Sequence, residues 1–588
     1  MLAAPLSPSP VRRPAFSAAR WIARTQPNAA DLEVARQCQI SPVTAAILRE
    51  RGYVDAAQVC AFFDPSCDGL LDPFDLPDIE PAIARLHQAI QNGEQIWVFG
   101  DYDVDGVTSA ALLTRALRAI GASVVPRIPE RHEGYGLNPA AVDEAKAAGA
   151  SLILSADCGI TAHEAAAHAA KIGLDLIITD HHEPDDTLPQ ALAVINPKRA
   201  DSVYGFRELS GCGVAFKVMQ ALLLRHWPKF APSFQDKFVE LVALAAVADC
   251  VPLVDENRIL AREGLKKLAQ TNKLGLKELI RSAGLKVSNG SLTGRQVGFS
   301  LAPRLNAAGR MASPRTAFNL LMATDLGEAA ALAAELEERN KERQELTRRI
   351  FEQAIEIADR DSDWDTDMLA IVVGPAWPRG VVGLVANRLT ELYGRPAIVL
   401  SCEKGVAHGS GRSVGKFDLH SILDATRDLL TEGGGHQAAC GLTLDEAHLP
   451  AFRERALQVA ADGLRMEDLV LAVEADCAVR GRDVSVQLAR EFEKLEPCGA
   501  GNHEPRLLLY GARLLESRPI GKTGDHLSWS LEADGRRFSA VWWSPGERAA
   551  DMAYGSTIDL VFVPEMNHWK DNVSLRLNIK EARRSDAL

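Results

Sequence analysis

Short apolar runs that alternate with amphipathic helical patterns dominate the chain from about residue 91 to residue 200. The first run covers residues 95–100, and a helical pattern over residues 108–120 follows it. Two more runs, residues 151–156 and 174–179, have the same character. Strands that are apolar throughout are typical of parallel sheets, because helices cover both faces of such sheets. The pattern therefore predicts an α/β fold built on a doubly wound parallel sheet.

Acidic residues and histidines follow each of these three runs directly. They are Asp101, Asp103 and Asp105 after the first run, Asp157 after the second, and Asp180, His181 and His182 after the third. Open parallel sheets place their sites at the carboxyl ends of the strands, so we expect these side chains to converge. Clustered carboxylates repel one another and stay ionised most easily around a cation. The first cluster taken alone also fits an acidic cap at the N-terminus of a helix.

Helical patterns dominate residues 205–330. The apolar helix expected over residues 238–247 leads to Asp249, a position that by itself is usually a solvated acid at a helix end. Residues 326–360 predict one long charged helix. Opposite charges four residues apart, such as Glu345 and Arg349, favour a solvent-exposed connector between domains.

A second α/β pattern over about residues 365–460 precedes short β-like runs that continue to the C-terminus. Turn residues separate these last runs, which predicts a small all-β barrel. Barrels of this kind bind single strands with aromatic and basic side chains, although aromatic residues in strands more often belong to a core. The candidates are Trp542, Trp543 and Trp569, with Arg536, Arg537 and Lys570.

Several arginines and glycine-rich turns are candidates for binding phosphate groups. Arginine is suited to bidentate phosphate binding, and exposed backbone N–H groups of glycine turns bind anions. For the loop at residues 127–136, composition alone favours a simple surface turn over an anion clamp. Three glycine-rich turns within the second α/β pattern make anion binding the better interpretation there. The candidates are Arg131, Arg304, Arg310, Ser410, Arg412, Gly434, Gly435 and His436.

Length and composition restrict the class of protein. The chain has 588 residues, which is too long for one core and predicts about three or four domains. Its ten cysteines include no CxxC pair, which favours reduced thiols in a cytoplasmic protein and no zinc ribbon. The net charge of −13 argues against a protein coated in nucleic acid but allows a local basic channel. No apolar run is long enough for a membrane span, and residues 1–30 are interpreted as a loose leader.

Five motifs in a fixed order resemble the DHH phosphoesterase family, from about Val98 to the C-terminus. They occupy residues 101–106 (DYDVDG), 156–159 (ADCG), 180–182 (DHH), 248–249 (AD) and 433–436 (GGGH). The resemblance implies an N-terminal leader and helical cap (1–90), a DHH domain (91–325), a connector helix (326–360), a DHHA1 domain (361–465) and an OB-like barrel (466–588). It also implies 5′→3′ degradation of single-stranded DNA to mononucleotides with Mn²⁺ or Mg²⁺, in DNA repair and recombination. The resemblance also suggests that the protein is a monomer. Its suggested partners are a single-strand-binding protein and a RecQ-type helicase.

The same resemblance assigns roles to residues of this chain. The metal ligands it implies are Asp103, Asp105, Asp157 and Asp249 with His181, and Asp157 would bridge two ions. Asp101 and Asp180 would orient ligands, and His182 would face the scissile phosphate as a charge stabiliser or proton donor. The arginines, Ser410 and the glycine-rich turn with His436 would hold DNA phosphates. Two divalent ions about 4 Å apart can activate a water and stabilise both oxygens of an in-line displacement.

Two positions depart from the family pattern. Many members have a histidine where this chain has Phe99, which cannot ligate a metal, so the first metal site is expected to be weaker. Many also have a histidine where this chain has Pro378, which puts one contact in doubt. Two other interpretations remain open at this point. One is a DHH phosphodiesterase for cyclic dinucleotides or short oligonucleotides, and the other is a noncatalytic DHH scaffold in a replication complex.

Overall fold

The computed structural model describes residues 20–134, 136–287, 290–469, 472–521, 523–549, 552–569 and 572–585. Most of the expected leader, residues 1–19, and the candidate Lys570 lie outside these ranges. The chain forms two compact units. The first unit contains Ala29–Asn340 and Arg490–Pro505, and the second unit contains the described residues before Ala29, Lys341–Ala489 and the residues from Arg506 onward.

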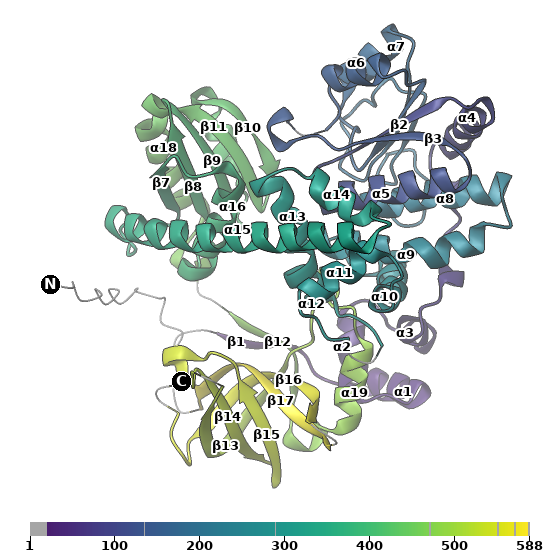
Figure 1. Ribbon diagram of the computed structural model, residues 1–588. Helices are drawn as coiled ribbons and strands as arrows, with labels where there is room; N and C mark the ends of the chain where they lie inside the picture. Colours follow the sequence, from purple (N-terminus) through teal and green to yellow (C-terminus); the bar gives the residue numbers. More distant parts are fainter. Residues whose placement is uncertain are drawn as a thin grey trace. The chain divides into compact units, whose positions relative to one another are not determined.

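A five-stranded parallel sheet is the centre of the first unit (Figure 1). Its spatial order is β3-β2-β4-β5-β6, so the strand order reverses between β2 and β4. This reversal is the topological switch point at which open α/β sheets form their sites. The strands are β2 (Gln95–Gly100), β3 (Ser123–Arg127), β4 (Leu152–Ala156), β5 (Asp175–Thr179) and β6 (Ala193–Ile195).

Alternate side chains of the strands enter two separate cores, which explains why the runs are apolar throughout. Ile96 and Val98 of β2 pack with helices α4 (Ile79–Asn92), α5 (Val104–Ala119) and α8 (Gly211–His226). Trp97 and Phe99 point to the other face, where α6 (Pro139–Ala147) and α7 (His163–Lys171) cover the sheet. Figure 1 shows these two helical layers on opposite sides of the strands. The predicted doubly wound parallel sheet is confirmed.

Helices before and after the sheet in sequence complete the first unit. The N-terminal residues form α1 (Ala29–Cys38), α2 (Pro42–Glu50) and α3 (Ala56–Phe63). After α8 come α9 (Ala231–Ala248), α10 (Asp255–Ala269), α11 (Leu274–Ser282), α12 (Gly294–Gln296), α13 (Ala302–Met311) and α14 (Arg315–Met322). Among the described helices, none has the length and apolarity needed to cross a membrane.

Helix α15 (Leu326–Asp361) is the long charged helix expected from the sequence (Figure 1). The expected solvent-exposed connector is exposed on part of its surface only, because Ala333, Leu336 and Ala354 are fully or almost fully buried. One face of α15 therefore packs as part of a core. The expected pairing of Glu345 with Arg349 also differs, since Glu345 pairs with Arg348, three residues away.

The second unit contains a mixed five-stranded sheet of order β10-β11-β9-β8-β7. Its strands are β7 (Ala370–Pro375), β8 (Ala397–Glu403), β9 (Val406–Arg412), β10 (Leu430–His436) and β11 (Ala439–Asp445). Helix α16 (Arg379–Tyr393) packs on one face, against Ala397 and Val399. Helices α17 (His420–Ala425) and α18 (Leu449–Gly463) pack on the opposite face.

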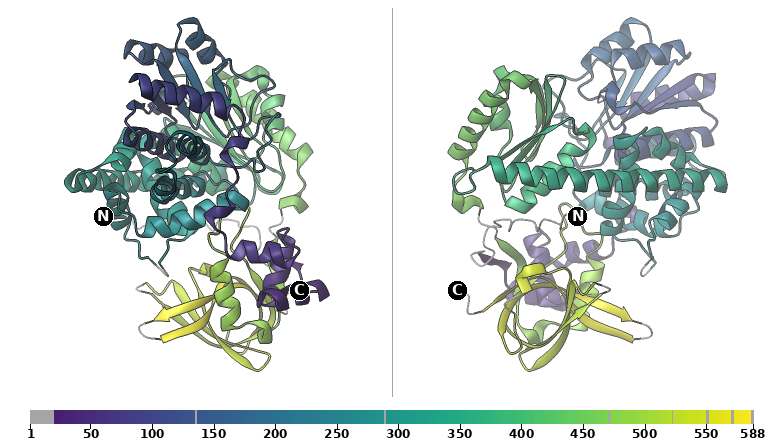
Figure 2. Two further views of the ribbon diagram at one scale, coloured as in Figure 1. Left: turned by 90° about the vertical axis from the view of Figure 1, so that its right-hand side faces the viewer. Right: turned by 60° about the vertical axis from the view of Figure 1, so that its left-hand side comes forward.

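The C-terminal strands close into a five-stranded barrel in the order β13-β14-β15-β17-β16, because β16 also pairs with β13 (Figure 2). Closure removes the exposed edges of the sheet and confirms the predicted OB-like barrel. The strands are β13 (Leu507–Ile520), β14 (His526–Ala533), β15 (Arg536–Trp542), β16 (Thr557–Trp569) and β17 (Asn572–Arg584). Helix α19 (Val486–Lys494) precedes the barrel.

Two further strands extend this barrel sheet from β13, and sequence reasoning missed the first. β1 (Trp21–Thr25) pairs in parallel with β12 (Val473–Val479), which pairs in parallel with β13. Of the aromatic candidates, Trp542 is 1% exposed and packs edge-on against Trp529, so it belongs to the barrel core. Trp543 is 47% exposed and remains a candidate for stacking.

Candidate metal centre

The three acidic segments of the first unit meet at one edge of the parallel sheet. β2 ends at Gly100, β4 at Ala156 and β5 at Thr179, and β4 lies between the other two. The residues that follow these ends are therefore neighbours in space although up to about 80 positions apart in sequence. Asp249 joins them from the C-terminal end of α9.

The imidazole of His181 is at the centre of this cluster. Its Nε2 atom lies 3.2 Å from Asp157 Oδ1, 3.6 Å from Asp249 Oδ2 and 3.8 Å from Asp105 Oδ2. His181 is 7% exposed, and Asp105 and Asp157 are 1% and 2% exposed. Three carboxylates thus converge on one ring nitrogen, and the site is open to solvent on the side of Asp249, whose side chain is 26% exposed.

Several polar atoms of the cluster have no hydrogen-bond partner within the described residues. They are His181 Nε2, Asp157 Oδ1 and Asp101 Oδ1, all of them buried. Buried polar groups in proteins are almost always satisfied, so such a concentration requires an explanation. A divalent cation supplies it, because carboxylate oxygens and an imidazole nitrogen are ligands of Mn²⁺ and Mg²⁺. The donor set therefore fits a metal centre.

Burial and mutual repulsion shift the ionisation of the acids. Burial, reinforced by neighbouring carboxylates, raises the pKa of Asp105 and Asp157 well above the usual range. Burial followed by the charge of Asp103 raises the pKa of Asp101 and of Asp249 to about 7. Burial lowers the pKa of His181 to about 3, so its ring is neutral and Nε2 can accept or ligate. Strong shifts of this kind are typical of functional sites.

Backbone amides hold Asp103 and Asp105 in place. Asp103 is the N-cap of α5, and its Oδ1 accepts a hydrogen bond from the N–H of Gly106 at 3.0 Å. Asp105 accepts from the N–H groups of Gly211 and Cys212 at the start of α8, each at 2.7 Å. Gly106 is required for close approach, since a Cβ atom there would lie 2.5 Å from the backbone nitrogen of Asp101.

Asp180 orients the two histidines that follow it. Its Oδ1 accepts hydrogen bonds from the backbone N–H of His181 at 2.7 Å and from His182 Nδ1 at 2.7 Å, and its Oδ2 accepts from the N–H of Ile160. Burial opposes ionisation of Asp180, but the bond from His182 outweighs it and the pKa of Asp180 is lowered. In the same way, burial opposes protonation of His182, but Asp180 raises its pKa to about 9. Asp180 therefore favours the protonated form of His182, with Nδ1–H directed to Asp180.

Two of the three predicted arginines of the first unit lie beside the DYDVDG segment. Arg131 stacks over the ring of Tyr102 at 4.3 Å and donates to the carbonyl oxygen of Gly309 at 3.1 Å. Arg310 is next to Gly309 and close enough to Tyr102 to lower its pKa, although burial raises that pKa overall. Arg304 differs, because its Nε donates to Glu337 of α15 at 2.6 Å. Its guanidinium thus already has a carboxylate partner.

The predicted phosphate ligands of the second unit share one face of the β10-β11-β9 sheet. In the strand register, Gly434, Gly441 and Ser410 form one row, and His436, Ala439 and Arg412 form the next. Arg412 Nη1 donates to Ser410 Oγ at 2.9 Å, and burial lowers the pKa of Arg412. Among the described residues, and apart from each glycine's chain neighbours, no atom lies within 4 Å of a Cβ position at Gly434 or Gly441, so this part of the face is open. Gly435 has a positive φ, and a Cβ atom there would lie 2.4 Å from the carbonyl oxygen of Ala439, so this position requires glycine.

Phe99 lies in an apolar cluster rather than among polar groups. It is 1% exposed and packs with Trp97, Cys158 and Ile178 on the face of the sheet that carries α6 and α7. Its contribution in this chain is packing.

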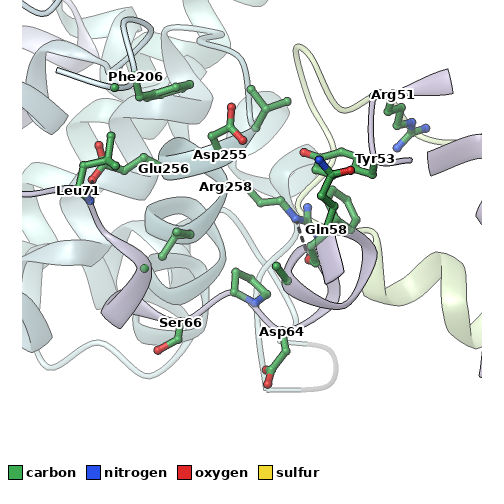
Figure 3. A pocket seen from close by; sticks show the side chains of 18 residues that line it. Arg51, Tyr53, Gln58, Asp64, Ser66, Leu71, Phe206, Asp255, Glu256 and Arg258 are labelled. Atoms are coloured by element: carbon green, nitrogen blue, oxygen red, sulfur yellow. Dashed lines mark hydrogen bonds between the residues drawn. The ribbon is translucent and has the colours of Figure 1, made fainter. Parts of the chain in front are cut away.

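A cavity of about 910 Å³ lies elsewhere in the first unit, between α3, the segment after it and the start of α10 (Figure 3). None of the predicted site residues lines it. Arg258 projects along its wall and donates to the carbonyl oxygens of Phe62, Leu495 and Lys494, which are at helix C-termini. Glu256 pairs with the buried Lys217. These polar groups join α3, α8, α10 and α19, and the cavity is separate from the metal centre.

Sequence reasoning missed the amides of Gly211 and Cys212, which hold Asp105. Residues 210–213 (SGCG) place a serine N-cap and small residues before an apolar helix, which signals the start of α8 but not its contact with Asp105. It also missed Tyr102, which supports Arg131.

Comparison with known families agrees with this architecture. Residues 95–246 match the DHH family N-terminal domain, residues 365–462 match the DHHA1 domain, and residues 475–581 match the RecJ OB domain. These ranges lie inside the segments predicted as 91–325, 361–465 and 466–588, although the outer boundaries remain predictions.

Individual proteins are similar over almost the whole chain. The single-stranded-DNA-specific exonuclease RecJ of Bacillus subtilis (strain 168) is 39% identical over 94% of this chain and 69% of that protein. The structure of RecJ from Thermus thermophilus in complex with Mn²⁺ has a TM-score of 0.82 at 31% identity, covering 97% of this chain and 80% of that one. The corresponding complex with Mg²⁺ has a TM-score of 0.76 at 29% identity, covering 96% and 78%. The chain therefore belongs to the RecJ family of DHH proteins.

Proposed function

We propose that this protein is a single-stranded-DNA-specific exonuclease that removes mononucleotides from the 5′ end by hydrolysis of the phosphodiester bond. Its relatives of known name at 31–39% identity are exonucleases of this specificity, and this supports the substrate class. The observation that carries the proposal is the buried cluster around His181 Nε2, in which three carboxylates converge and several polar atoms have no partner among the described residues.

Two divalent cations fit this donor set. Asp103, Asp105, Asp157, Asp249 and His181 would hold them, with Asp157 shared between the two and Asp101 nearby. When bound, such ions act as Lewis acids that activate a water and stabilise the charge of the reacting phosphate. Structures of RecJ relatives in complex with Mn²⁺ and with Mg²⁺ support these two metals.

The protonated imidazole of His182 supplies a second source of positive charge. Nδ1–H is fixed by Asp180 at 2.7 Å, so the orientation of the ring is set before substrate binds. The Nε2–H group can then donate a hydrogen bond to a phosphate oxygen, or give its proton to the departing 3′ oxygen. Preorganised donors of this kind stabilise a developing negative charge more effectively than water.

Arginine side chains and open backbone position the DNA strand. Arg131 and Arg310 lie beside the acidic segment, where they would hold phosphates next to the reacting one. Ser410, Arg412 and His436 form a polar face in the second unit, and Gly434 leaves that face open for close approach of a sugar–phosphate backbone. Such contacts position a strand without reading its base sequence. Arg304 would contribute only if its bond to Glu337 opened.

The proposed exonuclease activity also suggests a compartment, an oligomeric state and protein partners. We propose a cytoplasmic monomer that acts in DNA repair and recombination with a single-strand-binding protein and a RecQ-type helicase. The ten free thiols among the described residues are compatible with a reducing compartment.

The experiment that tests this function is a digest of 5′-labelled and 3′-labelled DNA, single-stranded and duplex, with Mn²⁺ or Mg²⁺. Labelled mononucleotide should appear at once from the 5′-labelled single strand, whereas the 3′-labelled strand should shorten progressively. Duplex DNA should remain largely intact. Immediate release of the 3′ label would reverse the proposed direction.

Two outcomes would favour the other interpretations. Faster hydrolysis of di- and trinucleotides or cyclic dinucleotides than of long strands would indicate a small-molecule phosphodiesterase. Absence of any hydrolysis, with Mn²⁺ bound, would indicate a noncatalytic scaffold.

A further inference from the structure

The first turn of α8 contacts two of the proposed metal ligands at once. The N–H groups of Gly211 and Cys212 donate to Oδ2 and Oδ1 of Asp105, each at 2.7 Å. The next N–H, of Gly213, donates to the N-cap Ser210 at 3.1 Å. The first N–H groups of a helix have no acceptor within the helix. In α8, those of Gly211 and Cys212 donate to the proposed metal ligand Asp105, and that of Gly213 donates to the N-cap Ser210.

These two bonds leave Asp105 available for a cation. A carboxylate oxygen can accept one N–H and still present a lone pair to a metal. Oδ2, which accepts from Gly211, is the oxygen that lies 3.8 Å from His181 Nε2. The turn of α8 therefore sets the direction in which Asp105 faces the cluster, and the positive helix end favours its ionised form.

Gly211 also provides the space that Asp157 occupies. A Cβ atom at position 211 would lie 2.2 Å from Asp157 Oδ1 and 2.6 Å from its Cβ and Cγ atoms. Asp157 cannot yield easily, because its backbone has a φ of 66° and its N–H donates to Thr179. The oxygen that would be displaced is the one 3.2 Å from His181 Nε2.

We propose that the first turn of α8 is a positioning element for the metal ligands, and that Gly211 is the residue on which it depends. Gly211 holds Asp105 through its amide and makes room for Asp157 through its missing side chain. This inference rests on the proposed two-metal function and adds residues that touch neither metal nor DNA.

The chain offers a matched pair of substitutions for the test. Gly211→Ala should displace Asp157, whereas Gly213→Ala adds the same methyl group two residues later, where the nearest atom is at 3.4 Å. We expect Gly211→Ala to weaken Mn²⁺ binding by at least about tenfold, the usual effect of losing a residue that supports metal ligands. Gly213→Ala should leave binding within about twofold of wild type. Binding is measured by calorimetry and by the Mn²⁺ electron paramagnetic resonance signal.

Stability of the metal-free protein gives an independent readout. Gly211→Ala should lower the melting temperature in the wild-type background but not in an Asp157→Gly background, because glycine accepts the left-handed backbone and removes the clash. An equal loss in both backgrounds, or unchanged Mn²⁺ binding in Gly211→Ala, would overturn the inference. Failure of the wild type itself to bind Mn²⁺ would instead overturn the proposed function.

A second, independent observation concerns two thiols of the N-terminal helices. Cys38 ends α1 and Cys60 lies in α3, and their Sγ atoms are 3.4 Å apart. Cys60 is exposed and Cys38 is partly buried. We infer that this pair is a reversible disulfide site that responds to peroxide. Closure would join α1 to α3, the helix whose C-terminal carbonyl oxygens Arg258 and Arg262 bind.

The chemistry balances with hydrogen peroxide as the two-electron oxidant. The Cys60 thiol attacks the peroxide, forms a sulfenic acid and releases one water, and Cys38 then displaces the hydroxyl group as a second water and forms the S–S bond. Cys60 is the exposed thiol and Cys38 is partly buried, so peroxide reaches Cys60 first and Cys38 acts second, at an already oxidised sulfur.

Peptide mass spectrometry of the peroxide-treated full chain tests this site. A linked peptide pair containing Cys38 and Cys60 should appear, should disappear with dithiothreitol, and should be absent from Cys60→Ser. Cys250→Ser, which removes another exposed thiol, should leave the link unchanged. Oxidation of Cys60 only to its acids, with no linked peptide, would overturn the inference.

Discussion

Asp157 combines a left-handed backbone, a buried carboxylate and an oxygen without a hydrogen-bond partner among the described residues. The φ of 66° turns the chain sharply after β4, so that the side chain points back over the sheet edge toward His181. Such a conformation is uncommon for a residue with a side chain and is concentrated at functional sites. A cation bound to Asp157 Oδ1 would explain both the left-handed backbone of this residue and the lack of a hydrogen-bond partner for its oxygen among the described residues.

Replacing Asp157 with alanine should abolish nuclease activity and leave the fold intact. Loss of the shared ligand removes several kcal/mol of transition-state stabilisation, about 4 kcal/mol for a thousandfold effect. Activity on single-stranded DNA and the circular dichroism spectrum check this result. Residual turnover above about a thousandth of wild type would show that Asp157 is not the shared ligand.

Replacing Phe99 with histidine should lower the Mn²⁺ concentration needed for half activity. The substitution restores the imidazole that many family members have at this position, at the end of β2 next to the acidic segment. Because Phe99 is 1% exposed, burying a polar ring there should also cost about 1–3 kcal/mol of stability. Metal titrations and thermal unfolding measure the two effects. If the Mn²⁺ requirement stays the same or rises, position 99 lies outside the coordination sphere.

At the scale of elements, strand pairing explains how the second unit gathers phosphate ligands. β9 and β10 both pair with β11, so Ser410, Arg412 and His436 occupy neighbouring positions on one face. Glycine at position 434 keeps the adjoining backbone accessible. The arrangement depends on the register of three strands, and a shift of one residue would send these side chains to the opposite face.

Arg412→Ala should weaken the use of 5′-phosphorylated strands more than that of 5′-hydroxyl strands. The expected loss is about 1.5–3 kcal/mol, the range for a hydrogen bond to a charged group. Comparing kcat/KM for the two substrates on wild type and variant isolates the contact. Arg455→Ala on α18, at the opposite face of the same sheet, is the matched control and should leave the ratio unchanged. An equal loss on both substrates would place Arg412 along the strand, and recognition of the 5′ end would then move to Arg304 or Arg310.

At the scale of the whole molecule, the two compact units contain different candidate sites. The buried acidic cluster belongs to the first unit, and the DHHA1 sheet and the barrel belong to the second. Metal binding should therefore stabilise one unit selectively.

Removal of divalent metal with EDTA should abolish activity without unfolding the protein, and Mn²⁺ should restore it. At a hundredfold excess over its dissociation constant, a ligand that binds only the folded state adds about 2.7 kcal/mol of stability. Hydrogen exchange should show this gain at the carboxyl ends of β2, β4 and β5 and not in the barrel strands. Asp157→Ala is the control, and it should lose the protection. Equal protection of the barrel would contradict a metal site confined to the first unit.

The sequence by itself determined the parallel sheet, the long helix and the barrel, because periodicity and turn residues act locally. It also located most of the acidic cluster, since the carboxyl ends of adjacent parallel strands meet by geometry. Asp249 was assigned through family resemblance alone, because no local pattern distinguishes a ligand from a solvated acid at a helix end.

Only the tertiary structure decided which of these residues act together. Gly211 and Asp105 are 106 positions apart, and their hydrogen bond exists because α8 packs against α5. Arg304 and Arg310 looked equivalent in sequence, but packing against α15 gives Arg304 a carboxylate partner while Arg310 lies near Tyr102. β1 joins a strand that lies about 450 residues later. Contacts of this range depend on the packed chain, and no local signal encodes them.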